Sequence, residues 1–265
     1  AFAHQPDGRR HAANYLRGLG GAALVEQQNH LLARALAELG QPGEAAAVFA
    51  AMIEAPTHPP TSALEAELRV RLAAARLDAG EPGTALSVLD EGLAGCTSPR
   101  LDAQAAFCSV TRGRALDALK RPDEAEVALH QAADIDPVAA EALPAVAEAR
   151  FLLAERQFAA LDAAHADLTA MRTEFDALDA AYARVSALDD PRWRVAATYR
   201  RGVLQQALAD RLRADPKRAA EASRAGQVAL EHFGAAVRLA RAHDVRTPWS
   251  RAADEQVSRL GESPN

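Results

Sequence analysis

The chain has 265 residues and a formal net charge of −6, and 49% of its residues are hydrophobic although only 5% are aromatic. Much of the apolar content is therefore alanine and leucine, which favour helices, and no stretch alternates Val, Ile and Thr as a strand does. The composition predicts an all-α fold that buries a sizeable core. The longest uncharged apolar run, residues 45–53, is too short to span a bilayer, so we expect a soluble protein without a transmembrane segment.

The N-terminus and the cysteines do not determine the cellular compartment of the protein. Residues 1–21 are expected to form an N-terminal lead-in, with a polar stretch over 1–10 and a short helix that is interrupted at 18–21. Because the chain begins with Ala1 rather than methionine, the sequence also allows a targeting segment that has been removed. A periplasmic or envelope-associated location is favoured over a cytoplasmic one. Cys96 and Cys108 fit either redox state, and the favoured interpretation is two packed free thiols, because free cysteine packs as a small hydrophobe.

The same turn motif recurs along the first half of the chain. Pro42, Pro82 and Pro122 are 40 residues apart, and glycine precedes the first two turns as Gly40 and Gly80. Glycine ends a helix in a left-handed conformation at little cost, and proline suits the first turn of the next helix. The spacing predicts three helical hairpins over residues 22–137, with helices over 22–39 and 44–54, 62–79 and 84–94, and 102–119 and 124–135.

Small residues recur in the third hairpin. Gly113, Ala125, Ala132 and Pro137 are separated by 12, 7 and 5 residues, and small side chains are needed where helices approach closely. This pattern resembles the tetratricopeptide (TPR) repeat family. The resemblance implies a right-handed solenoid of antiparallel helical hairpins that holds protein or peptide partners. The period of 40 exceeds the family's period of about 34, and the extra length is expected in the connectors at 56–61 and 96–99.

The resemblance also implies a binding groove, because in TPR proteins the first helix of each hairpin lines the groove. The family's lysine and asparagine clamp for a terminal carboxylate is not reproduced here. The arginines at 34, 71 and 114 nevertheless suit bidentate recognition of carboxylates, and they approach one another only if the hairpins stack in register. Carried over by position, the groove contains Gln27, His30, Arg34, Glu67, Arg71, Phe107, Val110, Thr111 and Arg114.

Longer helices are expected over residues 138–265, as a continuation of the solenoid. Residues 145–190 contain neither glycine nor proline, and apolar residues from Leu161 to Val185 alternate in steps of 3 and 4, as in a coiled-coil seam. A second series from Phe151 to Leu161 has a different phase, so a break between two long helices is predicted near residues 161–165. The aromatic and methionine side chains of this stripe are expected to form core.

A last, extended hairpin follows Pro191, and a helix over 248–260 is expected to cap the end of the solenoid. Tyr199 and Gly202 precede a second helix that carries Phe233 at a TPR-like position. This region resembles the C-terminal part of TPR proteins from the cell-envelope and gliding-motility machinery of myxobacteria. That resemblance implies a bacterial adaptor within a multiprotein complex and is carried by Trp193, Tyr199, Gly202, Phe233, Ala236 and Trp249.

Charge is unevenly distributed along the sequence. Residues 1–190 contain 16 Lys/Arg and 28 Asp/Glu, a net charge of −12, whereas residues 191–265 contain 14 and 8, a net charge of +6. The basic excess is densest at Arg200, Arg201, Arg211 and Arg213. It indicates either a solvated helix face or a charge dipole that steers a partner or promotes self-association.

Two classes of function follow. No zinc-binding, phosphate-binding, dinucleotide-binding or nucleophile-elbow motif occurs, so we expect no enzyme, cofactor, metal or small-molecule substrate. The favoured function is a non-enzymatic scaffold or adaptor that binds a protein or peptide partner. The alternative is nucleic-acid binding by the arginine-rich C-terminal part, with Trp193, Tyr199 and Trp249 stacking on bases. It is disfavoured because the whole chain is acidic.

Overall fold

The computed structural model describes residues 26–54, 62–92, 102–135, 139–161 and 168–261. All the regular structure in these ranges is helical, which confirms the all-α prediction. The chain divides into two compact units, residues 1–145 (unit 1) and 146–265 (unit 2). The division predicted after residue 137 stays a prediction, because residues 136–138 lie outside the described ranges. The predicted lead-in over 1–21, Cys96 and the connector at 56–61 lie outside them too.

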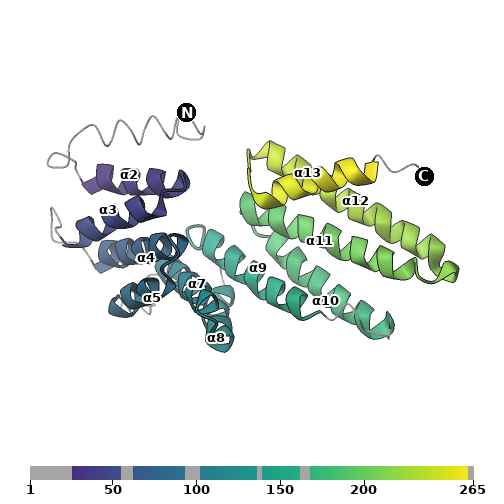
Figure 1. The fold of residues 1–265 in the computed structure, drawn as a ribbon, viewed down its shortest axis with the longest axis horizontal. Helices are drawn as coiled ribbons and strands as arrows, with labels where there is room; N and C mark the ends of the chain where they lie inside the picture. The colour runs from purple at the N-terminus through teal and green to yellow at the C-terminus, as the bar shows by residue number, and fades with distance from the viewer. Residues whose placement is uncertain (1–25, 55–61, 93–101, 136–138, 162–167, 262–265) are drawn as a thin grey trace. The chain divides into compact units, whose positions relative to one another are not determined.

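Unit 1 is built from helical hairpins that follow one another along the chain (Figure 1). Consecutive hairpins pack together, because α3 lies against α4, and α7 lies against both α4 and α5. This arrangement confirms the hairpins predicted from the proline spacing. The helices are α2 (Glu26–Glu38) and α3 (Pro42–Glu54), α4 (Ser62–Asp78) and α5 (Pro82–Glu91), and α7 (Asp102–Ala118) and α8 (Pro122–Ala133).

The turn inside each hairpin has the same geometry. Gly40 and Gly80 have φ angles of +76° and +83°, and Lys120 takes the equivalent place with φ of 61°. The residue after each of them donates its backbone N–H to a carbonyl five positions earlier, at 2.9 Å in all three turns. This is the Schellman pattern, which satisfies the last carbonyls of a helix. The third turn therefore forms without glycine, although a left-handed conformation costs a residue with a Cβ roughly 1–2 kcal/mol.

The small residues of the third hairpin lie where α7 and α8 approach most closely. Ala125 is fully buried. A Cβ atom added to Gly113 would lie 2.8 Å from the side chain of Leu129 and 3.3 Å from the carbonyl oxygen of Ala125. The first distance is shorter than a carbon–carbon contact allows, and the second is tight for a carbon–oxygen contact. The close approach predicted at Gly113 and Ala125 is thus confirmed.

Enlarging Ala125 is expected to destabilise the third hairpin. Ala125→Leu should lower the free energy of unfolding by about 1–3 kcal/mol, because the added carbons have no space between α7 and α8. Urea denaturation followed by far-ultraviolet circular dichroism measures the effect. Ala118→Leu, on the exposed end of α7, is the matched control. Equal midpoints for the two variants would contradict this account of the packing.

The core of unit 1 consists of neighbouring clusters. One cluster draws buried residues from α2, α3 and α4, including Leu36, Phe49 and Leu68. The next draws on α4, α5, α7 and α8, including Leu89. Val88 lies against both clusters. Each hairpin therefore completes the core of the hairpin before it, as in repeat proteins generally.

Cys108 belongs to the second of these clusters and is disulfide-bonded. None of the cysteines within the described ranges is free. The interpretation of free thiols is therefore wrong for Cys108. Its buried, apolar surroundings suit a packed thiol and a half-cystine equally, so the sequence pattern could not separate the two. Cys96 is the other cysteine of the sequence.

Unit 2 contains longer helices (Figure 1). The separate helices α9 and α10 confirm the break predicted between two long helices. α11 and α12 run side by side as an antiparallel pair, and α13 packs on both. The carboxylate of Asp190 accepts the backbone N–H of Trp193 at 2.9 Å and so caps α11. The elements are α9 (Leu143–Ala160), α10 (Leu168–Ser186), α11 (Pro191–Leu212), the 3-10 turn η2 (Pro216–Arg218), α12 (Ala219–Ala242) and α13 (Pro248–Gly261).

Aromatic side chains fill the main core of unit 2. The ring of Phe151 on α9 lies 5.8 Å from Tyr182, 5.1 Å from Trp193 and 5.5 Å from Trp249, measured between ring centroids. These rings come from α9, α10, α11 and α13, so Phe151 joins four helices. The predicted stripe from Phe151 to Val185 is confirmed as core where it is described, since Phe175 and Tyr182 are buried in the same cluster.

Candidate partner-binding site

The first helices of unit 1 present a common outer face. On each helix the buried residues lie on one side, and residues three, four or seven positions apart form a stripe on the other. On α2 this stripe contains Leu31 and Arg34, and on α4 it contains Glu67, Arg71 and Asp78. On α7 it contains Phe107 and Arg114. We call these seven residues, together with His30, the first-helix face.

Contacts between polar and charged side chains join the three helices across this face. His30 Nε2 on α2 lies 3.5 Å from Glu67 Oε1 on α4. The same oxygen lies 2.8 Å from Arg71 Nη2. Further along α4, Asp78 Oδ1 lies 2.8 Å from Arg114 Nη2 on α7. The structure thus brings side chains from three successive hairpins together on one surface.

Two large apolar side chains are exposed on the outer helices of the face. Leu31 on α2 is 51% exposed and Phe107 on α7 is 37% exposed. A binding partner that spans α2 to α7 would cover both side chains, and apolar surface rimmed by polar residues is typical of sites that bind proteins. Sequence reasoning selected Phe107 but missed Leu31. The signal was available, because Leu31 lies three residues before Arg34 on the same helical stripe.

The predicted groove residues do not all reach the surface. Val110 and Thr111 are only 3% and 4% exposed, and Thr111 Oγ1 donates a hydrogen bond to the carbonyl oxygen of Phe107 at 2.7 Å. The prediction that these two residues line a groove is corrected, because both point into the contacts of α7 with its neighbours. Arg34 is exposed and forms no ion pair with any residue that the structure describes. The side chain of Gln27 lies outside the described residues.

The basic residues of the C-terminal part are largely paired with acids. Arg200 binds Glu155 and Arg201 binds Asp179, and both acids precede residue 190 in the sequence. Residues 146–265 together contain 18 Lys/Arg and 17 Asp/Glu, a net charge of +1. The basic segment 191–265 therefore does not form a basic unit of its own, because in the folded structure its arginines pair with carboxylates from earlier in the chain. Arg213 likewise binds Asp210 on its own hairpin.

Arg200 lies at the centre of a part-buried polar cluster. Its Nε donates a hydrogen bond to Glu155 Oε1 at 2.7 Å, and Tyr182 Oη donates to the same oxygen at 2.5 Å. The guanidinium carbon lies 4.9 Å from the ring centre of Phe158 and 4.8 Å from that of Trp249. Burial raises the pKa of the Tyr182 phenol, and its hydrogen bond to Glu155 raises that pKa further. We call Glu155, Tyr182, Phe158, Arg200 and Trp249 the arginine cage.

The aromatic residues proposed to stack on bases already pack against other rings inside the protein. Trp193 is buried against Phe151. Tyr199 lies between Phe233 and Trp249, with ring centroids 5.6 Å and 5.9 Å away. Rings that already pack against one another inside the fold are not free to stack on nucleic-acid bases. The geometry therefore offers no support for the nucleic-acid alternative.

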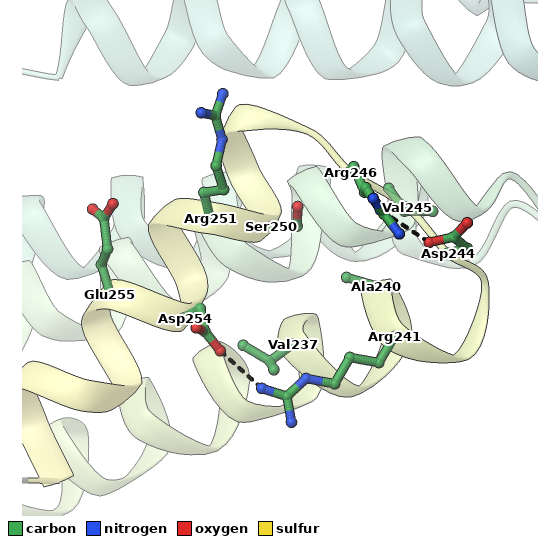
Figure 2. A pocket seen from close by; sticks show the side chains of 10 residues that line it. All are labelled: Val237, Ala240, Arg241, Asp244, Val245, Arg246, Ser250, Arg251, Asp254 and Glu255. Carbon is green, nitrogen blue, oxygen red and sulfur yellow. Dashed lines mark hydrogen bonds and ion pairs between the residues drawn. The ribbon is translucent and has the colours of Figure 1, made fainter. Parts of the chain in front are cut away.

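A pocket of about 530 Å³ lies between the end of α12 and the start of α13 (Figure 2). Val237, Ala240 and Val245 form its apolar part. Arg241 Nη2 pairs with Asp254 Oδ1 at 3.0 Å, and Arg246 Nε pairs with Asp244 Oδ1 at 3.1 Å (Figure 2). Because the lining carries equal numbers of arginines and carboxylates, it favours neither an anion nor a cation.

The described residues form neither a metal site nor a membrane-spanning helix. They contain no group of three or more His, Cys, Asp or Glu side chains placed to hold a metal ion. Among the same residues, no helix combines the length and the apolar character needed to cross a bilayer.

Comparison with known proteins supports the fold. The structure is similar to BtubC (BKLC) from P. vanneervenii with a TM-score of 0.52, at 14% sequence identity over 94% of each chain. The described part of the chain is all-α and is built from packed helical hairpins. A TPR-repeat protein from Bacteroides fragilis is also matched, over 97% of this chain and 99% of that one, with a TM-score of 0.37 and 14% identity. No family model matches the sequence, and no curated protein is significantly similar to it.

Proposed function

We propose that the chain is a non-enzymatic scaffold or adaptor, and that the first-helix face of unit 1 binds a peptide or protein segment. The observation that carries this proposal is the exposure of Leu31 on α2 and Phe107 on α7, on helices that polar contacts join to α4 between them. Burial of two such side chains supplies affinity, since fully burying one large apolar side chain is worth about 1.5–3 kcal/mol. The charged groups between them supply register and specificity.

The arginines of the face suit an acidic group on the partner. Arg34 forms no ion pair with any described residue and has an exposed side chain. A partner carboxylate can therefore bind it without displacing an ion pair to any described residue. Arg71 and Arg114 already bind Glu67 and Asp78, so a partner must compete with an internal carboxylate at those two positions. The face therefore favours a segment with apolar anchors and a carboxylate near α2.

We further propose that the chain works in an oxidising compartment of a bacterial cell, such as the periplasm, as part of an envelope complex. The disulfide at Cys108 supports this location, because disulfides persist in such compartments and are rare in the cytosol. Trapping free thiols with an alkylating reagent in intact cells, followed by intact-mass analysis, tests it. Two alkylated cysteines per chain would exclude the proposed compartment.

Removing the two apolar side chains should weaken partner capture. The double variant Leu31→Ser with Phe107→Ser is expected to recover specific partners at least about tenfold less efficiently than the parent chain, which corresponds to about 1.4 kcal/mol. The measurement is affinity purification from the organism that encodes the chain, with quantitative mass spectrometry. Val228→Ser on α12 removes an apolar side chain whose exposure of 36% is close to the 37% of Phe107, and it is the matched control.

A second variant separates the apolar and charged contributions. Arg34→Ala, Arg71→Ala and Arg114→Ala together should reduce capture while leaving the helical circular-dichroism signal unchanged. If neither multiple variant differs from Val228→Ser in the proteins that it recovers, the binding site does not lie on the first-helix face. RNA or DNA as the main recovered ligand would instead favour the nucleic-acid alternative.

A further inference from the structure

A second groove lies in unit 1 on the other side of α7. It has a volume of about 370 Å³ and is lined by α5, the end of α7 and α8. α7 packs against both α5 and α8, so its side chain Leu116 forms the floor between those two helices. None of the groove's lining residues belongs to the first-helix face. We call this feature the α5–α8 groove.

The groove combines an apolar floor with an exposed apolar rim. Leu86, Leu116 and Ala128 line it and are nearly buried by the fold. Val127 on α8 stands at the rim and is 61% exposed, the highest value among the large hydrophobic residues that the structure describes. Its side chain points away from the hairpin core formed by Ala125 and Leu129. An apolar side chain placed over the floor would cover Val127 and Leu116 together.

The rim of the groove carries an excess of negative charge. Arg112 Nη2 pairs with Asp90 Oδ1 at 2.6 Å, and Arg121 Nη2 pairs with Glu124 Oε2 at 2.6 Å. These contacts neutralise both arginines of the lining. Asp123 is then left without an ion pair to any described residue. Residues 1–145 as a whole contain 12 Lys/Arg and 19 Asp/Glu, a net charge of −7, so both the rim and the surrounding surface attract a cation.

We propose that the α5–α8 groove is a second docking site, and that its occupant is a basic segment of a partner protein. The segment places one large aliphatic or aromatic side chain over Leu86 and Leu116, and a neighbouring lysine or arginine reaches Asp123. The groove volume of about 370 Å³ falls within the range of about 300–1,000 Å³ for binding sites. It therefore accommodates a single anchoring side chain with part of its backbone. This inference does not depend on binding at the first-helix face.

The test selects peptides of about twelve residues, long enough for three helical turns, from a random display library on the full chain. The selection is repeated on Gln131→Trp, whose added ring covers the groove from its exposed rim. Peptides lost on that variant should share a large apolar residue next to lysine or arginine. Fluorescence anisotropy then measures the affinity of the best peptide for each variant.

The expected affinities distinguish the groove from other surfaces. Gln131→Trp should weaken binding at least about tenfold, and Asp123→Asn should weaken it severalfold while reducing its salt dependence. Gln227→Trp on α12 is the matched control, because it adds the same ring at an exposed glutamine of unit 2. The variant Leu31→Ser with Phe107→Ser should bind the peptide as tightly as the parent chain, which separates this site from the first-helix face.

Three results would overturn the proposal. If the selected peptides lack a basic residue, Asp123 has no role in binding them. If Gln131→Trp and Gln227→Trp lose the same amount of affinity, the peptide binds the protein surface non-specifically. A concentration-dependent dimer in sedimentation that disappears in Gln131→Trp would show that the groove binds a second copy of this chain instead.

Discussion

Phe151→Ala should destabilise unit 2 by about 3–5 kcal/mol, the range found when a buried aromatic side chain is removed. Phe151 is almost fully buried and contacts the rings of Tyr182, Trp193 and Trp249, so its loss leaves a cavity bounded by four helices. Both tryptophans of the chain, Trp193 and Trp249, lie in unit 2. Tryptophan fluorescence during urea denaturation therefore reports this unit directly.

The matched control is Phe107→Ala, which removes an exposed phenylalanine from unit 1. Its effect on the fluorescence transition should be negligible, because Phe107 belongs to the other unit. A Phe151→Ala transition within about 1 kcal/mol of the parent would mean that the aromatic core repacks around the cavity. That result would contradict the role assigned to Phe151.

Arg200→Ala is expected to lower the free energy of unfolding of unit 2 by about 3 kcal/mol. The substitution leaves Glu155 as a part-buried carboxylate without its counter-charge, and removing one member of a buried pair typically costs about 3–5 kcal/mol. The estimate is at the lower end because Glu155 and Arg200 keep side-chain exposures of 21% and 19%. Fluorescence-detected denaturation measures this change as well.

Arg200→Lys should recover little of the lost stability. Lysine keeps the positive charge but cannot form two parallel hydrogen bonds to Glu155 or lie flat between the rings of Phe158 and Trp249. A double-mutant cycle with Glu155→Gln should give a coupling energy of about 1–3 kcal/mol. Additive effects in that cycle would show that the arginine cage is not a coupled unit.

The hairpins were predictable because their signals are local. A helix end needs a left-handed residue and a proline suits the next helix start, so Gly40, Pro42 and their equivalents mark each turn in the sequence itself. The packing of α7 on α8 was predictable for a similar reason, since Gly113 and Ala125 are small where the helices meet. The core role of Phe175 and Tyr182 followed from their spacing alone.

The candidate site was harder to predict because it depends on contacts between residues that are far apart in the sequence. Val110 and Thr111 were placed on the surface by analogy with family positions, but the packing of α7 buries both. The pairing of Arg200 with Glu155 joins residues 45 positions apart, and no helical periodicity reveals such a contact. The first-helix face was predicted only in part: His30, Glu67 and Arg71 meet as the in-register stacking requires, whereas Leu31 and Asp78 emerged from the structure.

The division of the core into neighbouring clusters has a consequence for how the chain unfolds. Leu36 and Phe49 belong to one cluster and Leu89 to the next, with Val88 as a shared neighbour, while Phe151 and Tyr182 anchor another in unit 2. Cooperativity then passes only between adjacent hairpins, as in a one-dimensional chain of coupled elements. Native-state hydrogen exchange should consequently show several protection levels along the sequence instead of one global value.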